Sequence, residues 1–302
     1  MIDLKEIIPD QESKDNYRSL CELYKNNAPI IIFFGAGLGN IPGIPTWDKL
    51  LELLCKKVKM RYMSLKGKYW DKASKIEKRY NEKKQDVYDE IKSLLQPIHT
   101  EKYGIHNILI KGENNAFITT NYDNIFSEIN KDLVNRLNEQ FYPDFNPSRI
   151  LGSEIIYLHG NIFNSNDIVF TSDQYTNAYK KFNNIKSVIE SAYWYNSIIF
   201  IGFSFEDEFF AELYTNIQKN EHKYYGHMRE KAPRDYIIFS TPYEGKNIFD
   251  EGGLDNLKKK FIGKYNLLPI AYNLKFRGEE KGHIKLEKIL KELLRSRPSK
   301  TI

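Results

Sequence analysis

Four short groups of polar or glycine residues stand immediately after strongly apolar runs of the sequence. They occupy residues 35–40, 119–123, 159–160 and 202–207. A short apolar run that ends in such a group is typical of a strand buried on both faces of a parallel sheet. Because the carboxyl ends of parallel strands lie along one edge, residues far apart in the chain should meet there in one cleft. The sequence therefore predicts a ligand site at this edge.

The residue types in these groups suit the binding of phosphates and the transfer of protons. Gly35, Gly37 and Gly39 let a backbone turn come close to a ligand, where exposed N–H groups complement negative charge. Their spacing does not match G-x-G-x-x-G, and no acidic residue stands clearly at the end of a following strand to bind a ribose. A nucleotide site and a plain tight turn are therefore both open interpretations. His159 can accept a proton near neutrality if its pKa stays near the ordinary value of about 6.5.

Apolar runs predict the sheet that must position these groups. The expected strands cover residues 30–34, 115–120, 154–158, 168–170, 197–201, 236–240 and 268–272. Amphipathic stretches between them favour an α/β fold with a Rossmann-like, mostly parallel sheet. Residues from about 48 to 112 are charged, rich in tyrosine and without a strand pattern, so we expect a helical insertion there. We expect residues 1–302 to form a single domain.

The composition argues against a membrane protein. Hydrophobic residues make up 41% of the chain and charged residues 28%, and no apolar run approaches the roughly 20 residues that a membrane span needs. The N-terminus lacks the apolar core of a signal peptide, so we expect a cytoplasmic location. Cys21 and Cys55 stand at apolar positions of expected helices, which favours buried thiols over a disulfide or a metal site.

Basic charge gathers in one segment of the chain. Residues 56–92 contain 13 Lys/Arg and 6 Asp/Glu, a local balance of +7, whereas the whole chain carries +5. The segment also holds tyrosines, a tryptophan and arginines, residue types that are enriched at interfaces. It is a candidate surface for a protein partner or for self-association, and a solvated helical face is the alternative. We do not expect direct binding of nucleic acid, because no phosphate- or base-reading motif is present.

Five blocks of sequence, taken together and in order, resemble a known family. They are Gly35-Ala36-Gly37, Gly43-Ile44-Pro45 followed by Trp47, Thr120-Asn121-Tyr122-Asp123, Leu158-His159-Gly160 and Gly202-Phe203-Ser204. These blocks look like the signature of the sirtuin (silent information regulator 2-like) family, above all of its prokaryotic NAD-hydrolase branch. The resemblance extends from residue 30 to about residue 240. It implies a Rossmann-type sheet that binds NAD and cleaves its nicotinamide–ribose bond.

The resemblance also implies a role for each matching residue. Asn121 would orient the reacting ribose or the attacking water, Asp123 would face the nicotinamide carboxamide, and His159 would be the general base. The residues expected to bind NAD are Gly35, Ala36 and Gly37 at the diphosphate, Trp47 near the nicotinamide ribose, Thr120 and Tyr122 beside Asn121, Gly202 with Ser204 on the adenosine side, and Asn40 in place of a family serine. Bond cleavage builds positive charge on the ribose, which suits a polar amide and a nearby base.

Each of these residues also has a structural interpretation. His159 before a glycine could cap a strand, and Asn121 and Asp123 are common turn and helix-capping residues. Ser204 also fits a helix start, as do the two acidic residues that follow it closely. Trp47 fits a core position as well as a ligand contact. We expect function for His159, Asn121 and Asp123, because they occur within the ordered blocks.

The chain departs from protein-deacylating sirtuins in one decisive respect. The paired Cys-x-x-Cys zinc module is absent, because Cys21 and Cys55 are the only cysteines. We therefore expect no metal, and we expect water rather than an acyl-lysine to be the acceptor.

The predicted function is an NAD+ glycohydrolase that takes NAD as its substrate and yields nicotinamide and ADP-ribose. The resemblance implies a role in anti-phage defence by NAD depletion, with activity controlled by a homo-oligomer or a protein partner. An NAD-dependent protein deacylase and a non-catalytic NAD or ADP-ribose sensor are the alternatives.

Overall fold

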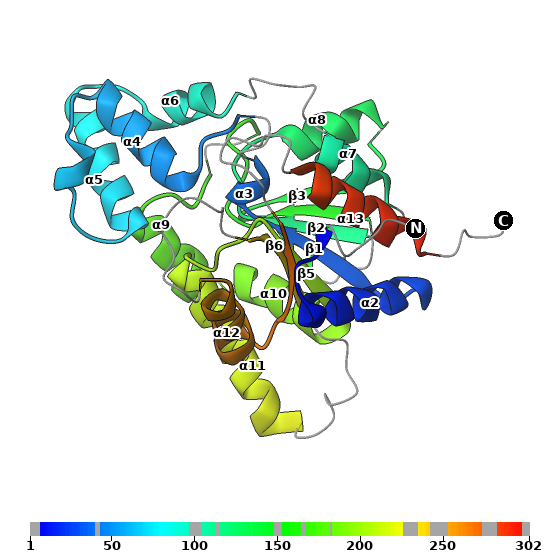
Figure 1. Cartoon of the computed structure of the whole chain (residues 1–302). Coiled ribbons are helices and arrows are strands. Elements are labelled where there is room, and N and C mark those ends of the chain that lie inside the picture. The colour runs from blue at the N-terminus through cyan, green and yellow to red at the C-terminus, as the bar shows by residue number, and fades with distance from the viewer. Residues whose placement is uncertain are drawn as a thin grey trace.

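A computed structural model gives the architecture of most of the chain. It describes residues 7–39, 43–96, 104–112, 115–133, 135–147, 153–164, 167–181, 183–225, 235–241, 253–273 and 283–297. Within these ranges the chain forms a seven-stranded sheet with helices on both of its faces (Figure 1). None of the helices in these ranges is both long and apolar enough to span a bilayer.

The sheet has its first strand in the middle. Its strands are β1 (Ile30–Phe34), β2 (Asn115–Thr119), β3 (Asn138–Phe141), β4 (Glu154–Tyr157), β5 (Ser197–Ile201), β6 (Tyr236–Ser240) and β7 (Leu268–Tyr272). The order across the sheet is β3-β4-β2-β1-β5-β6-β7, and each neighbouring pair is parallel. This confirms the predicted α/β fold with a Rossmann-like parallel sheet.

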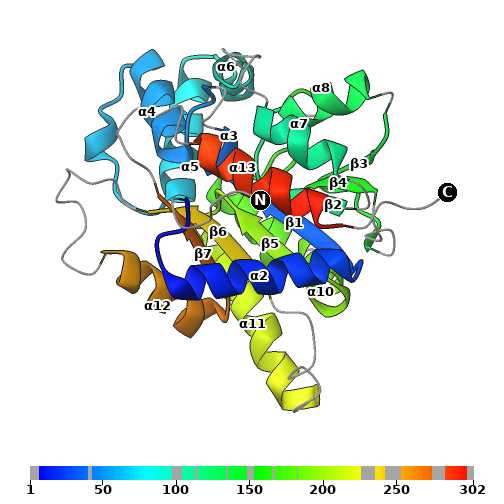
Figure 2. The ribbon, with the colours of Figure 1, turned by 45° about the vertical axis from the view of Figure 1, so that its right-hand side comes forward.

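The central strand shows why the sheet is buried on both faces. Ile30, Ile32 and Phe34 belong to one core cluster and Ile31 and Phe33 to the other, because successive side chains alternate across a strand. The first cluster lies under helices α2 (Gln11–Lys25), α7 (Gly104–Lys111), α8 (Ile125–Asp132) and α13 (His283–Arg295), and the second under α10 (Asn184–Tyr195), α11 (Glu208–Tyr225) and α12 (Gly253–Tyr265). In Figure 2, α2 and α13 lie in front of the strands.

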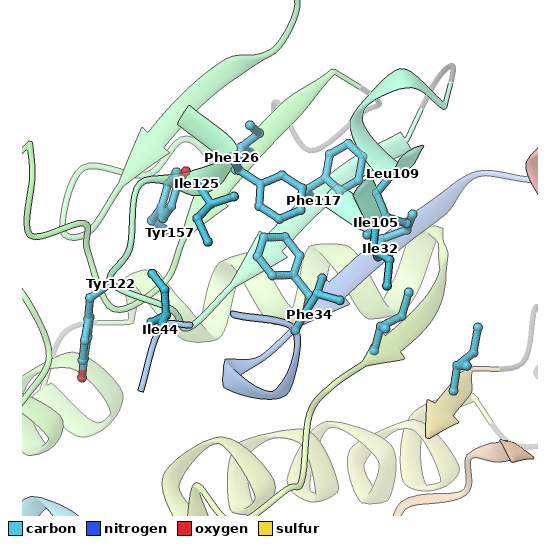
Figure 3. Packing of buried hydrophobic residues seen from close by; sticks show 14 of the residues in the cluster. Ile32, Phe34, Ile44, Ile105, Leu109, Phe117, Tyr122, Ile125, Phe126 and Tyr157 are labelled. Atoms are coloured by element: carbon cyan, nitrogen blue, oxygen red, sulfur yellow. The ribbon is translucent and has the colours of Figure 1, made fainter. Parts of the chain in front are cut away.

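Aromatic packing fixes the first face of the sheet close to the predicted ligand site. The Phe34 ring at the end of β1 stacks on Phe126 of α8, with 4.1 Å between ring centroids. Phe117 of β2 packs against the same ring at 5.8 Å, and Figure 3 shows these side chains together with Tyr157 of β4. This packing joins the end of β1 and the middle of β2 to helix α8.

Among the described residues between β1 and β2, the regular secondary structure is helical, as the sequence predicts. After the short helix α3 (Ala36–Gly39), helices α4 (Trp47–Lys57), α5 (Tyr69–Glu82) and α6 (Val87–Leu94) form a lobe beside the sheet (Figures 1 and 2). The lobe is tied to helix α9 (Ser172–Thr176), where the Ser172 hydroxyl donates to Asp71 Oδ1 at 2.8 Å. The lobe is therefore fixed against the part of the fold that follows β4.

One predicted strand is wrong, and one observed strand is not predicted. Residues 168–170 form no strand, although they are buried, and their backbone groups find single partners: Val169 N–H donates to the His159 carbonyl at 2.9 Å. Burial there comes from the surrounding side chains rather than from pairing in the sheet. The edge strand β3 was missed, because its sequence Asn-Glu-Gln-Phe is polar and half-exposed and lacks an apolar run.

Candidate active site

A cavity of about 710 Å³ lies at the carboxyl ends of β1, β2, β4 and β5. Its wall includes residues from all four groups singled out in the sequence: 36–38, 120–123, His159, 202–204 and 206–207. Side chains of the helical lobe, among them Tyr69 and Trp70, complete the wall on another side. The volume lies within the range of about 300–1,000 Å³ that is usual for ligand sites. The predicted convergence on one cleft is therefore present in the structure.

His159 is buried in the wall of this cavity. Its side chain is only 3% exposed, and Nε2 lies 2.7 Å from the Tyr179 hydroxyl. The following Gly160 has a φ of +80°, and a Cβ there would lie 2.3 Å from the Asp167 carbonyl oxygen. Burial lowers the pKa of His159 to about 3, so the imidazole is neutral at physiological pH. The ordinary pKa assumed from the sequence does not hold, because the ring is withdrawn from water.

Asn121 and Asp123 both line the cavity and both hold the local backbone in place. Asn121 Nδ2 donates to the Gly35 carbonyl at 3.3 Å, which links the end of β2 to the end of β1. Asp123 Oδ1 accepts the N–H of Ile125 at 3.2 Å, an Asx turn that leads into α8. Burial raises the pKa of Asp123 to about 6. A turn-forming role and a place in the cavity wall thus coexist in these two residues.

The glycine turn after β1 is packed tightly against the end of β5. The N–H groups of Gly35 and Gly37 donate to the carbonyls of Ile201 and Gly202, at 3.1 and 3.0 Å. A Cβ on Gly37 would lie 2.9 Å from the Gly202 carbonyl oxygen. These glycines therefore let two backbones approach each other. Gly37 and its neighbour Ala36 line the cavity, whereas Gly35 is buried and is not among the lining residues.

The other residues expected to bind NAD differ in how far they are buried in the cavity wall. Trp47 lines the cavity and also packs on Phe170, with 5.4 Å between ring centroids, so it is both a wall and a core residue. Tyr122 is buried, and its hydroxyl donates to the Val169 carbonyl at 2.6 Å. The remaining lining residues of this set are Thr120, Gly202 and Ser204. Asn40 lies outside the described residues.

Asp207 also lines the cavity. The sequence places it in the polar group 202–207 but favours a helix start over a role of its own. It does cap α11, because Oδ1 accepts the N–H of Phe210 at 3.1 Å. Its other oxygen, Oδ2, is buried, lies 3.7 Å from His159 Nε2 and, among the described residues, accepts no hydrogen bond of ordinary geometry. Burial raises the pKa of Asp207 to about 6. An acidic residue a few positions after a strand end was the available signal.

Neither cysteine takes part in a disulfide, and no metal site is seen among the described residues. Cys55 is buried, Cys21 is half-buried, and both are free thiols. Among the described residues, no group of three or more His, Cys, Asp or Glu side chains is arranged to hold a metal ion. The absence of a metal from the working protein stays a prediction.

A family model described as the SIR2-like domain matches residues 115–270 of the chain, which is just over half of its 302 residues. The chain belongs to the SIR2-like family. The SIR2-like match includes Asn121, Asp123, His159 and Asp207, whereas the glycine turn and the helical lobe precede it. A search of curated proteins found no match. Membership of this NAD-dependent family indicates an NAD-related activity.

Proposed function

We propose that this chain is an NAD+ glycohydrolase that releases nicotinamide and ADP-ribose. The observation that carries the proposal is one cavity whose wall holds the Asn121 amide, the neutral His159 imidazole and the carboxyl groups of Asp123 and Asp207. This set offers a polar amide, a proton acceptor and negative charge, which are the groups that the cleavage of a ribosyl bond to a pyridinium needs. Membership of the SIR2-like family supports NAD as the molecule that carries such a bond.

The charges of the cavity fit the charges of NAD. The nicotinamide ring of NAD+ is a cation. The carboxyl groups of Asp123, which is buried, and of Asp207, whose side chain is 15% exposed, would stabilise a nearby cation. The diphosphate is an anion. Lys260 lines the same cavity, and its ammonium group lies 3.4 Å from the Ser204 carbonyl oxygen, where it is available to a diphosphate.

In this proposal the departing nicotinamide takes the electron pair of the bond, and a water molecule adds to the ribose carbon and loses a proton. Asn121 orients the reactants through its amide, which the hydrogen bond to the Gly35 carbonyl holds in place. His159 accepts the proton, since a neutral imidazole has a free lone pair. The aromatic side chains of Trp47 and Trp70 add apolar surface to the cavity wall.

The test is to incubate the purified protein with NAD, with and without an acyl-lysine peptide, and to identify the products by chromatography. We expect nicotinamide and ADP-ribose without the peptide, and near-complete loss of both in Asn121→Ala and in His159→Ala. Products that form only with the peptide would support the deacylase. Binding of NAD without any product would support a sensor and contradict the proposal.

We further propose that the chain acts in anti-phage defence by depleting NAD, and that assembly or a protein partner controls it. The support is the sequence resemblance together with the placement of basic residues on the helical lobe, where Lys56, Lys59, Arg61 and Lys66 are exposed. Reversing these four charges to Glu should weaken self-association, measured by light scattering, and NAD turnover in the assembled state. An unchanged mass and turnover would place the control elsewhere.

A further inference from the structure

The loop between β5 and α11 holds the Asp207 side chain in one position. Two of its residues lie in the left-handed region of φ, Gly202 at +63° and Phe205 at +57°. The second is uncommon for a residue with a large side chain, and its ring is held by stacking on Tyr265 with 4.3 Å between centroids. Oδ1 of Asp207 then accepts the N–H of Phe210 at the start of α11. The loop conformation and the hydrogen bond to Phe210 thus fix the position of the carboxyl group.

The second carboxylate oxygen of Asp207, Oδ2, is not needed for the helix cap. A helix cap needs one oxygen, and Oδ2 is left buried beside the cavity, 3.7 Å from Nε2 of His159. A buried carboxylate oxygen is costly to desolvate unless a donor or a cation meets it. The Tyr175 hydroxyl also meets this carboxyl group. Of the two neighbours only the imidazole can carry a positive charge, so a proton placed on that ring would give Oδ2 a cationic partner.

Among the groups that surround His159 and Asp207, the Asp207 carboxylate supplies the negative charge next to the imidazole. Facing them from the neighbouring elements are the hydroxyl groups of Tyr122, Tyr175 and Tyr179, and burial raises the pKa of each well above its ordinary value, so all three stay neutral. Glu208 follows Asp207 in sequence, and its carboxylate pairs with Lys68. The Tyr179 hydroxyl can donate to Nε2 or accept from it, so it orients the ring without favouring either charge state.

We propose that Asp207 is a positioning residue for His159: its carboxylate is the counter-ion that lets the buried imidazole hold a proton during NAD cleavage. The inference rests on the proposed function. Water adds to the ribose carbon, the carbon–nitrogen bond breaks with its electron pair on nicotinamide, and the proton of the water passes to His159. The imidazolium and the Asp207 carboxylate then form an ion pair, until the proton leaves to solvent.

The variant that tests the proposal is Asp207→Asn, since asparagine keeps an oxygen for the helix cap and removes the charge. We expect kcat for nicotinamide release to fall about 10²-fold, the lower end of what acid–base groups contribute, with KM within about threefold. Activity of the natural protein should rise as the pH increases through about 6, where Asp207 ionises, and this rise should vanish in the variant. Asp207→Glu should restore part of the rate, and Glu212→Gln, on an exposed position of the same helix, should match the natural protein. Equal rates for Asp207→Asn and the natural protein would overturn the proposal.

A second measurement does not depend on turnover, so it separates this inference from the proposed function. The ring nitrogen signals of His159 are followed by NMR as the pH is lowered from 8. In the natural protein they should shift near pH 6, when the neighbouring Asp207 takes up a proton, and in Asp207→Asn this step should be missing. The same titration in both proteins, or no step in either, would show that the two groups are not coupled. If the step is present but NAD is not cleaved, the proposed function fails and the coupling of the pair stands.

Discussion

Gly202→Ala tests whether the glycines at the site serve the packing of the backbone. Gly202 has a φ of +63°, and a Cβ there would lie 2.6 Å from the backbone nitrogen of Leu38. The left-handed conformation costs an alanine about 1–2 kcal/mol, and the overlap adds about 1–3 kcal/mol, as in overpacked cores. We therefore expect the free energy of unfolding to fall by about 2–5 kcal/mol, a large part of the about 5–15 kcal/mol that is typical of whole proteins.

The assay is urea denaturation of the variant beside Gly263→Ala as a matched control. Gly263 lies exposed within α12, and a Cβ there would meet nothing within 4 Å, so the same substitution should raise stability by about 0.5–1 kcal/mol. NAD affinity is measured on both variants by calorimetry. If Gly202→Ala is as stable as the natural protein and binds NAD more weakly, the glycine serves the approach of the ligand and our reasoning on backbone packing is refuted.

Three further substitutions have expected effects on stability that urea denaturation measures. Between pH 4 and 6 the folded state keeps a proton on Asp207, whose pKa is about 6 against 3.8 for the free group, while the unfolded state has lost it. The free energy of unfolding therefore falls as the pH rises through that window. Compared with the natural protein, Asp207→Asn should be up to about 3 kcal/mol more stable at pH 7.5 and equally stable near pH 4. A variant less stable than the natural protein at pH 7.5 would contradict this. Tyr179→Phe should cost about 1 kcal/mol, because it removes the hydrogen bond to His159, and no loss would show that this bond is absent in solution. Lys258→Met should cost about 1–3 kcal/mol, because the buried ammonium group lies 2.5 Å from Asp10 Oδ1; an unchanged midpoint would show that the pair contributes nothing.

Much of the fold was predictable because a strand that is buried on both faces of the sheet consists of consecutive apolar residues. The strand at Ile30–Phe34 consists of five apolar residues, and the structure places it at the centre of the sheet with its side chains divided between two cores. The edge strand at Asn138–Phe141 was not predictable in this way, since it pairs with one neighbour only and three of its four side chains are polar. Residues 168–170 are apolar and buried, and the sequence therefore predicts a strand there. An apolar segment can, however, be buried without joining a sheet.

The candidate site was predictable in its location and less so in its chemistry. Polar groups after four strands indicated one cleft, and the structure brings them to one cavity. The charge state of His159 depends on how far burial lowers its pKa, which requires the packing of Tyr175 and Tyr179 around the ring. The approach of Asp207 to His159 depends on a loop whose left-handed residues include Phe205, a conformation that the residue type does not indicate. These features arise from tertiary packing, and no local pattern encodes them.

The central claim is most directly tested under single-turnover conditions, with the protein in excess over NAD and without any peptide. Excess protein favours self-association and makes even a slow reaction visible within one turnover. Proton NMR of the mixture is followed for the nicotinamide ring signals, beside His159→Ala at the same concentration. We expect free nicotinamide and ADP-ribose to form in equal amounts with the natural protein and not with the variant. NAD that stays intact throughout, or the same products at the same rate with His159→Ala, would contradict it.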